Sequence, residues 1–247
     1  MRISERQEQI LNLLKDNGFM TVDKLSKLTY TSPSSIRRDL THLQNMNLLK
    51  RTHGGVTILE NTNQAIPLYN RLTKNTTGKR KIAKIASALL AESQVILLDG
   101  STTASFLIPY IAQFKDVTLF TNNMITAISA IEYGIHTHCI GGSSINNSAV
   151  LAGEEAYRTV SSLTPDLLFF SSQSLDRNGI ISDPTQEENY LRSIMLENSR
   201  KSIFLCDHEK FDSRSLYTLT TVAKVNYSVF DKEWEVLNGK YKSISAK

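Results

Sequence analysis

Residues 32–43 read SPSSIRRDLTHL, and this stretch decides the fold of the first part of the chain. Ser32 followed by Pro33 predicts a helix start, because serine caps helix N-termini and proline suits the first helical position. Ile36, Leu40 and Leu43 recur at helical spacing and predict one buried face. The opposite face of this helix is therefore polar and basic.

Two shorter helices are predicted before this stretch, and a hairpin is predicted after it. Apolar residues up to Leu14 give a helical stripe that ends before Gly18, and Thr21 caps a brief second helix. Residues 48–58 read as two short strands around a Gly-Gly turn. Three helices followed by a hairpin predict a winged helix-turn-helix domain over residues 1–58.

The net charge of the chain lies in this domain. Residues 1–58 carry nine Lys or Arg and five Asp or Glu, whereas residues 59–247 carry nineteen of each. A small basic domain joined to a neutral one is typical of a module that binds a polyanion. Arginines on a recognition helix can bind guanine edges or phosphates, and basic residues of a wing can follow the DNA backbone. We therefore expect double-stranded DNA to contact Ser32, Ser34, Ser35, Arg37, Arg38, Thr41, His42, Lys50, Arg51 and His53.

Composition places the chain among ordinary globular proteins. Of its 247 residues, 40% are hydrophobic and 21% are charged, which excludes wholly disordered and collagen-like chains. No apolar run approaches the roughly 18 residues of a membrane helix, and the first residues lack a signal peptide. Cys139 and Cys206 lie far apart and form no disulfide framework. We expect a cytoplasmic protein without a membrane segment.

A second domain is predicted over residues 79–247. Residues 59–78 are polar and aperiodic and are expected to be a linker. From Lys79 onwards apolar strands alternate with helices, which predicts an α/β domain with a largely parallel sheet. Strands are expected at 94–99, 117–121, 136–140, 166–171, 202–206 and 224–230. Helices are expected at 79–92, 103–114, 124–133, 153–163 and 185–199.

The sequence Asp99-Gly100-Ser101-Thr102-Thr103 lies between a predicted strand and a predicted helix. Free backbone N–H groups at such a turn, together with three hydroxyls, can hold an anion, although neither a Walker A loop nor a Rossmann fingerprint is present. Ligands of open α/β sheets bind at the carboxyl ends of the strands. Further polar or glycine positions follow predicted strands and are expected at the same edge: Asn122, Asn123, Gly141, Gly142 and Asp207 to Lys210.

Two motifs resemble the DeoR family of bacterial transcription regulators. They are Ile36-Arg37-Arg38-Asp39-Leu40 in the third helix and Arg51-Thr52-His53-Gly54-Gly55 in the hairpin. Residues 79–83 and 98–103 are similar to further family motifs, and the resemblance covers nearly the whole chain. It implies a second domain similar in fold to pentose-phosphate isomerases, with a phosphorylated sugar as effector.

The resemblance also implies an effector site made of Asp99, Gly100, Ser101, Thr102, Thr103, Asn122, Gly141, Gly142 and Lys210. In the family pattern, residues 101–103 hold the phosphate, whereas Asp99, Asn122 and Lys210 line the sugar or balance charge. This chain has Gly-Ser where many relatives have Ser-Gly after the aspartate, and it has side chains at 171–174 where many have glycines.

Several residues admit two interpretations. Asp39 would repel phosphate, so we expect it to pair with an arginine, while His42 is either a base contact or an exposed residue. Lys210 either binds phosphate as a point charge or is a surface lysine before Phe211. The residues that either tune specificity or form exposed helix pairs are Asp183, Glu187, Glu188 and Arg192. A metal site could be read from His136, His138, Cys139, Cys206 and His208, but no tight ligand spacing is present, so no metal is expected.

The sequence thus predicts a transcription repressor of sugar-metabolism genes, with no cofactor and no catalytic residues. A homodimer or homotetramer is expected, because helix-turn-helix proteins usually pair their domains on two half-sites. The alternative is a sugar-phosphate isomerase that carries a DNA-binding domain. Such an enzyme needs a carboxylate base, and Asp99 is the candidate.

Overall fold

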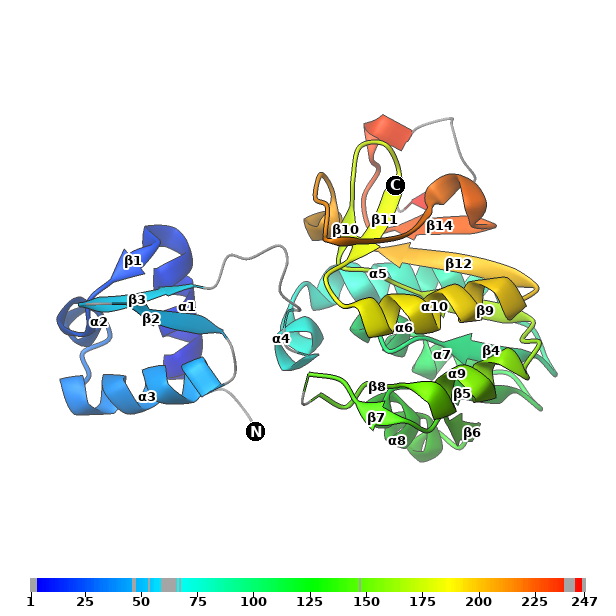
Figure 1. Cartoon of the computed structure of the whole chain (residues 1–247), viewed down its shortest axis with the longest axis horizontal. Coiled ribbons are helices and arrows are strands. Elements are labelled where there is room, and N and C mark those ends of the chain that lie inside the picture. The colour runs from blue at the N-terminus through cyan, green and yellow to red at the C-terminus, as the bar shows by residue number, and fades with distance from the viewer. Residues whose placement is uncertain are drawn as a thin grey trace. The chain divides into compact units, whose positions relative to one another are not determined.

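The computed structural model describes residues 4–45, 48–52, 54–58, 66, 68–146, 148–237 and 243–245. They belong to two compact units, Met1–Asn61 and Thr62–Lys247 (Figure 1).

The first unit has the predicted winged helix-turn-helix fold. Its helices are α1 (Glu5–Asn17), α2 (Val22–Leu28) and α3 (Pro33–Asn45). Strands β2 (Leu49–Thr52) and β3 (Gly55–Ile58) form the expected hairpin. A further strand, β1 (Phe19–Met20), pairs with β3 and was not predicted, because two residues are too short to show a strand pattern.

Caps and a small apolar core hold this unit together. Ser4 and Gln7 form a capping box at the start of α1, and Thr21 caps α2 by accepting a hydrogen bond from the Lys24 N–H. The three helices meet through fully buried side chains, which include Ile10, Leu14, Leu25, Ile36, Leu40 and Leu43.

The second unit is built on a seven-stranded sheet in which every pair of neighbours is parallel. The strand order is β15-β14-β12-β9-β4-β5-β6. The strand bounds are β4 (Val95–Leu98), β5 (Thr118–Thr121), β6 (His136–Cys139), β9 (Leu167–Phe170), β12 (Lys201–Cys206), β14 (Tyr227–Phe230) and β15 (Ser243–Ser245). A parallel sheet with crossover helices is the predicted α/β architecture.

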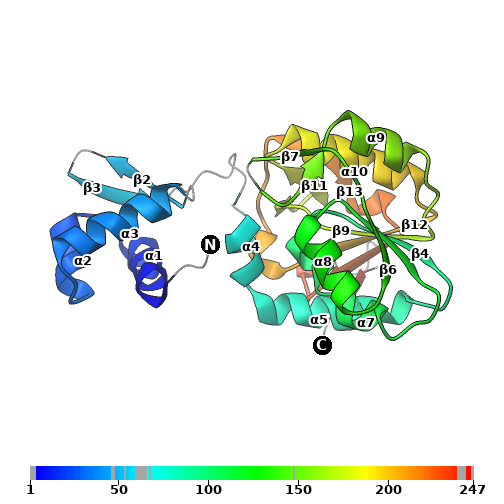
Figure 2. The same cartoon turned by 90° about the horizontal axis from the view of Figure 1, so that it is seen from below.

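Helices cover both faces of this sheet (Figure 2). One face packs against α5 (Thr76–Ala86), α7 (Ile108–Ile111) and α8 (Met124–Glu132), and the other packs against α9 (Glu154–Ser161) and α10 (Gln186–Asn198). Successive side chains of a strand pack into the cores on opposite faces of the sheet. In β9, Phe169 lies in the core on the α5 side and Phe170 in the core on the α10 side. The two cores thus fix the carboxyl ends of the strands at one edge.

The expected helix 103–114 is instead two short helices. They are α6 (Thr102–Ser105) and α7, and Pro109 occupies one of the first positions of α7. Proline has no N–H to donate and its ring clashes with the carbonyl four residues earlier, so a continuous helix cannot form. A 3₁₀ turn, η1 (Ser87–Leu89), likewise replaces the last turn of the expected helix 79–92.

Smaller elements at the carboxyl edge were not predicted. The strands β10 (Ser174–Leu175), β11 (Ile180–Asp183) and β13 (Tyr217–Thr221) form a three-stranded antiparallel sheet. The strands β7 (Ser143–Ser144) and β8 (Leu151–Ala152) form another pair, and 3₁₀ turns form η2 (His208–Lys210), η3 (Val222–Lys224) and η4 (Glu235–Leu237). Most of these segments are too short or too polar to produce a hydrophobic period.

Part of the stretch expected to be a linker is helical. Helix α4 (Leu68–Thr73) lies within residues 59–78, and α5 begins at Thr76. Leu68 is buried in the core of the second unit, with Leu72 packed against it. Two apolar side chains on a six-residue helix are too few for the sequence pattern to reveal.

No helix in the described part of the chain is long and apolar enough to cross a membrane.

Candidate functional site

The turn after β4 presents hydroxyl groups at the carboxyl edge of the sheet. Oδ1 of Asp99 accepts a hydrogen bond from the Ser101 N–H at 3.1 Å. Ser101 caps α6 by accepting a hydrogen bond from the Ala104 N–H at 3.2 Å. The turn places Ser101, Thr102 and Thr103 in the lining of one cavity.

Gly100 allows this turn to approach its neighbours closely. A Cβ atom built on Gly100 lies 2.5 Å from Cγ1 of Val150 and 3.3 Å from Nδ2 of Asn122. The carbonyl of Gly100 accepts a hydrogen bond from Nδ2 of Asn123 at 3.1 Å. Any larger residue would displace Val150 or open the turn.

Lys79 reaches the turn from α5. It is 3% exposed, and its Nζ donates to Oγ1 of Thr102 at 3.2 Å and to the carbonyl of Arg71. No carboxylate among the described residues lies within ion-pair distance of this ammonium group. Burial, followed by the positive charge of Lys210, lowers the pKa of Lys79 to about 8. The cavity therefore contains a buried cation with no acidic partner in contact.

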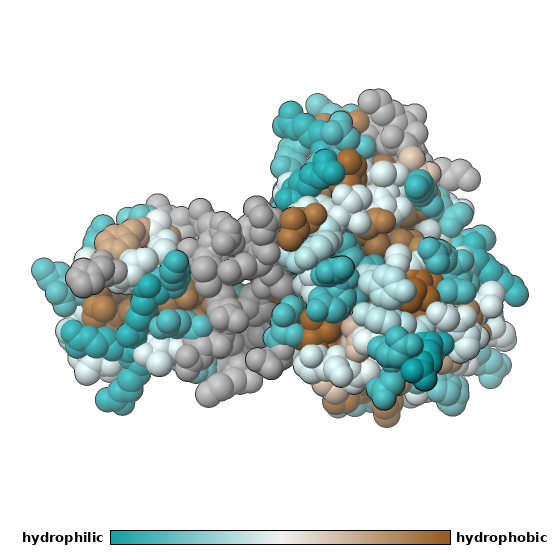
Figure 3. All heavy atoms as spheres, viewed as in Figure 1, coloured by the Kyte–Doolittle hydropathy of each residue, from teal (hydrophilic) through white to brown (hydrophobic). Residues whose placement is uncertain are grey.

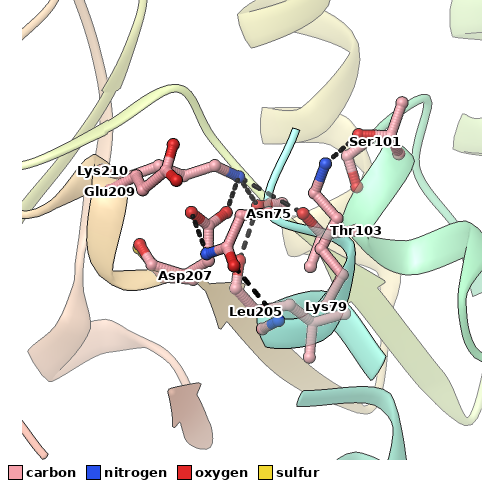
Figure 4. Close-up of polar contacts among 12 residues, drawn as sticks. Asn75, Lys79, Ser101, Thr103, Leu205, Asp207, Glu209 and Lys210 are labelled. Atoms are coloured by element: carbon pink, nitrogen blue, oxygen red, sulfur yellow. Dashed lines mark hydrogen bonds and ion pairs between the residues drawn. The ribbon is translucent and has the colours of Figure 1, made fainter. Parts of the chain in front are cut away.

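Lys210 reaches the same turn from η2 (Figure 4). Its Nζ donates to Oγ of Ser171 at 2.8 Å and to Oγ1 of Thr103 at 3.3 Å, and it lies 3.4 Å from Oδ2 of Asp207. Burial favours the neutral form of Asp207, but the charge of Lys210 and a hydrogen bond from Asn75 outweigh burial and lower its pKa. The ammonium group of Lys210 thus faces the turn, and its role in binding phosphate stays a prediction.

The cavity has a volume of about 570 Å³, including its open mouth. Five cationic side chains and three carboxylates line it, for a net charge of +2: Arg71, Lys74, Lys79, Arg192 and Lys210 against Asp183, Asp207 and Glu209. The uncharged lining residues are Ile66, Ser101, Thr102, Thr103, Ser171, Ser172 and Gln173. Positive charge beside a row of hydroxyls suits a polar anion.

Arg192 lines the cavity and contacts three buried carboxylates, of which Asp183 also lines it. Its guanidinium donates to Asp99 at 2.7 Å, to Asp183 at 2.8 Å and to Glu188 at 2.8 Å. Burial opposes the charge of Arg192, but these carboxylates outweigh burial and raise its pKa. Burial also raises the pKa of Asp183 to about 6, against the opposing effect of Arg192. Asp183, Glu187, Glu188 and Arg192 were each expected either to tune specificity or to form exposed helix pairs. Of these four residues, Glu187 alone is exposed.

The structure separates the expected effector residues into two groups. Ser101, Thr102, Thr103 and Lys210 line the cavity, whereas Asp99 and Gly100 support the turn from behind. The other expected residues, Asn122, Gly141 and Gly142, are also absent from the cavity lining among the described residues. Nδ2 of Asn122 donates to the Leu151 carbonyl at 2.8 Å, and a Cβ on Gly142 would lie 2.5 Å from the Ala152 carbonyl oxygen. Asn122 therefore holds the β8 segment beside the turn, and Gly142 allows that segment to approach closely.

Four lining residues were missed by the sequence analysis: Ile66, Arg71, Lys74 and Lys79, of which Arg71 and Lys79 contact Thr102. Lys79 shares a buried helix face with Ile82, Ala83 and Ala86, and a charged residue on an apolar stripe is the signal that could have revealed it. Arg71 lies in the stretch expected to be a linker, and the sequence contains no comparable signal for it.

The first unit presents α3 as predicted. Oγ of Ser32 accepts a hydrogen bond from the Ser35 N–H at 3.3 Å, and Arg37 and Arg38 are exposed. Asp39 pairs with an arginine, as expected, because Nε of Arg6 lies 2.6 Å from its carboxylate. The exposed arginines are thus free of that carboxylate.

The hairpin is joined to α3 by one of its basic residues. Nη2 of Arg51 donates to the Arg37 carbonyl at 2.8 Å and to Oγ1 of Thr41 at 2.9 Å. Lys50 is exposed and His42 is half-buried. Ser34 is exposed at the start of α3, and His53 lies outside the described residues.

The residues considered as metal ligands have other contacts. His138 stacks on Phe120 with ring centroids 4.6 Å apart, and His136 contacts His138 edge-on. Cys206 is buried, and burial raises the pKa of the exposed Cys139 thiol. The described residues contain no group of three or more His, Cys, Asp or Glu that could hold a metal ion.

Two family models match the chain. A model described as the DeoR C terminal sensor domain matches residues 74–232, and a model described as the DeoR-like helix-turn-helix domain matches residues 6–62. Together they span both units.

Curated relatives match over nearly the whole chain. The HTH-type transcriptional regulator GolR of Listeria innocua is 30% identical over 93% of this chain and 91% of that protein. The L-fucose operon activator of Haemophilus influenzae is 31% identical over 92% of this chain and 91% of that protein. The HTH-type transcriptional repressor GlcR of Bacillus subtilis is 27% identical over 92% of this chain and 88% of that protein.

The chain is also similar to solved structures, among them that of ribose 5-phosphate isomerase A from Methanocaldococcus jannaschii. The two proteins are 16% identical over a match that spans 54% of this chain and 53% of the isomerase chain, with a TM-score of 0.40.

The low pKa of Lys79 predicts a specific dependence of stability on pH. The folded protein releases this proton near pH 8, whereas the unfolded chain keeps it up to about 10.5. Wild-type stability should therefore rise relative to Lys79→Met as pH increases from 7.5 to 9.5, by about 1–2 kcal/mol. Urea unfolding in buffers free of phosphate and sulfate measures this difference. For the control variant Lys81→Met, at an exposed position of the same helix, the difference in free energy of unfolding from wild type should not change with pH. If the difference for Lys79→Met is also independent of pH, the pKa of Lys79 is not lowered in the folded protein.

Proposed function

The chain belongs to the DeoR family of transcriptional regulators, and from that premise we propose that it represses sugar-metabolism genes under the control of a phosphorylated sugar. The first unit binds operator DNA, and the cavity of the second unit binds the sugar phosphate. We place the protein in the cytoplasm, where its operator lies.

The observation that carries the effector proposal is the pair of lysines at the turn formed by Ser101, Thr102 and Thr103, which we call the hydroxyl turn. Lys79 is buried without an acidic partner in contact, and Lys210 reaches the same turn from the other side of the cavity. A phosphomonoester carries about −1.5 to −2 charge at pH 7 and can pair with both ammonium groups at this turn. Phosphate oxygens are strong acceptors, and lysine ammonium and threonine hydroxyl groups are donors.

The rest of the cavity suits a small polyhydroxy compound. The lining includes Ser172, Gln173 and the carboxylate of Asp183, whose polar groups can exchange hydrogen bonds with sugar hydroxyls.

We propose binding rather than catalysis for this cavity. An isomerase needs a carboxylate base that faces the carbon acid. Asp99, the candidate for that role, is held by Arg192 and by the N–H groups of Ser101 and Ser171. The carboxylates that line the cavity are also paired with cations, because Asp183 contacts Arg192, Asp207 contacts Lys210 and Glu209 contacts Lys74. Turnover of a pentose or hexose phosphate by the purified protein would overturn this part of the proposal.

An effector can change operator affinity only by binding one conformation of the protein more tightly than another. By linkage, DNA must then change the effector affinity by the same factor. Typical coupling free energies correspond to a 5- to 150-fold effect, that is, about 1–3 kcal/mol.

We propose that α8 forms the contact between copies of the chain. Its exposed face carries Met124, Ile125, Ile128, Ile131 and Tyr133, which are 39–62% exposed. Figure 3 shows apolar atoms at the lower edge of the second unit, over this helix. The neighbouring β6 is the last strand on its side of the described sheet, so its outer backbone groups are unpaired there. A two-fold axis beside an edge strand and an apolar helix produces a self-complementary contact.

The first prediction of the proposal concerns the effector. Lys210→Met should lose most of the thermal stabilisation that a saturating sugar phosphate gives to wild type, because the charge that faces the phosphate is gone. A thermal-shift screen of pentose and hexose phosphates identifies the ligand in wild type and then compares the variants. Lys224→Met, at an exposed position, should respond like wild type. Equal responses in wild type and Lys210→Met would place the effector elsewhere.

The second prediction concerns DNA. Arg37→Ala and Arg38→Ala should each weaken operator binding, and an arginine that reads a base should cost about 1–3 kcal/mol and relax specificity at one position. Both side chains are exposed, so the fold and its melting temperature should not change. Affinities are measured at fixed salt by fluorescence anisotropy, and unchanged affinity in both variants would remove α3 as the recognition helix.

The third prediction concerns assembly. Ile128→Asp should reduce the molar mass measured by light scattering from that of a dimer or tetramer, because a carboxylate in an apolar contact must be desolvated. Leu216→Asp provides a matched control, since Leu216 is 61% exposed in the loop before β13. A monomeric wild type, or an Ile128→Asp variant with the wild-type mass, would refute this interface.

A further inference from the structure

Helix α4 is the first described helix after the DNA-binding unit along the chain. Residues 59–67 connect it to the end of β3. It is attached to the second unit by buried Leu68, by Leu72 and by a backbone carbonyl at the cavity. Helix α4 thus combines a contact with the cavity and the place in the chain that follows the first unit.

The attachment at the cavity uses the groups that a phosphate would need. The carbonyl of Arg71 accepts hydrogen bonds from Oγ1 of Thr102 at 3.0 Å and from Nζ of Lys79. A threonine hydroxyl has one proton, so Thr102 can donate either to this carbonyl or to a phosphate oxygen, but not to both. A phosphate that accepts the Thr102 proton thus competes with the backbone of α4, whereas Lys79 has a third proton for the phosphate.

A phosphate in the cavity would give the side chain of Arg71 a new partner, whereas it would take one from the Arg71 carbonyl. Its guanidinium lines the cavity and is 18% exposed, and its nearest carboxylate contact is 3.9 Å, from Nη2 to Oε1 of Glu188. Its buried Nε has no hydrogen-bond partner in the described part of the chain. A guanidinium group with an unused donor is suited to a phosphate, because its N–H groups can bind two oxygens at once.

We propose that Arg71 reports occupancy of the cavity to the DNA-binding unit. The phosphate replaces the Arg71 carbonyl as the acceptor for Thr102, Lys79 donates its third proton to it, and the Arg71 guanidinium binds the same phosphate. Helix α4 shifts as its backbone loses the Thr102 bond and its side chain gains new ones. This inference rests on the proposed function, since it requires a phosphate ester in the cavity.

The proposal makes Thr102→Asp an imitation of the occupied state. A carboxylate at this position cannot donate to the Arg71 carbonyl, and it can pair with Lys79, whose Nζ lies 3.2 Å from Oγ1 of Thr102. Without any ligand, the operator affinity of Thr102→Asp should equal that of wild type saturated with the sugar phosphate. Thr102→Ser keeps the hydroxyl and should behave like ligand-free wild type.

The test uses the full chain with ribose 5-phosphate, glucose 6-phosphate and inorganic phosphate as probes. Hydrogen exchange of the amides of residues 68–73 should change at least threefold when a bound ester saturates wild type, and Thr102→Asp should show the changed rate without ester. Arg71→Met should bind the ester about 10-fold more weakly. At saturating ester its operator affinity should change less than twofold, whereas the control Arg80→Met, from an exposed position, should respond fully.

The outcomes separate this inference from the proposed function. If no probe shifts the melting temperature or the operator affinity of wild type, the proposed function fails for these ligands and the inference fails with it. If wild type responds but Arg71→Met responds equally and residues 68–73 exchange at an unchanged rate, the cavity is the effector site and Arg71 does not report its occupancy. If Thr102→Asp has the operator affinity of ligand-free wild type, the exchange of acceptors at α4 is refuted.

Discussion

A buried guanidinium group with three carboxylates holds together the elements that form the cavity. Arg192 lies on α10 and contacts the end of β4 through Asp99, β11 through Asp183, and its own helix through Glu188. Removing one partner from such a buried group is costly, because an unpaired charge remains in a medium of low dielectric constant. The second carboxylate oxygen of Asp99 fixes the Ser101 N–H, so the geometry of the hydroxyl turn depends on Arg192. An arginine that does not contact the turn directly thus determines its shape.

The same arrangement explains why Lys79 has no carboxylate in contact. Asp99, Asp183 and Glu188 are occupied by Arg192, and Asp207 is shared between Lys210 and Asn75. Lys79 is left without a carboxylate in contact, and the free protein bears the cost of burying its charge. An anion that enters removes this cost in addition to forming its own contacts. The site is therefore selective for anions before any particular hydrogen bond to a sugar is considered.

The two units are stabilised in different ways, which fits their different roles. In the first unit the core consists of aliphatic side chains from three capped helices, and polar contacts such as Arg6–Asp39 and Arg51–Thr41 orient α3 and the hairpin. In the second unit a parallel sheet brings the ends of β4, β9 and β12 together, and the functional groups come from loops and short helices at that edge. The sheet thus fixes the positions of functional groups that come from elements far apart along the chain.

The sequence by itself determined the winged helix-turn-helix fold, the parallel α/β unit, the hydroxyl turn and Lys210, because caps, helical period and strand-loop order are local patterns. It also determined that α3 is the basic helix with Arg37 and Arg38 on its open face. The tertiary structure alone decided that Arg192 binds Asp99, that Asn122 and Gly142 support a neighbouring strand instead of lining the cavity, and that Arg71 belongs to the site. These residues are separated by tens of positions, and their contacts arise only when the two cores align the strand ends. Periodic patterns in the sequence do not reveal contacts between residues so far apart, so tertiary packing determines these contacts.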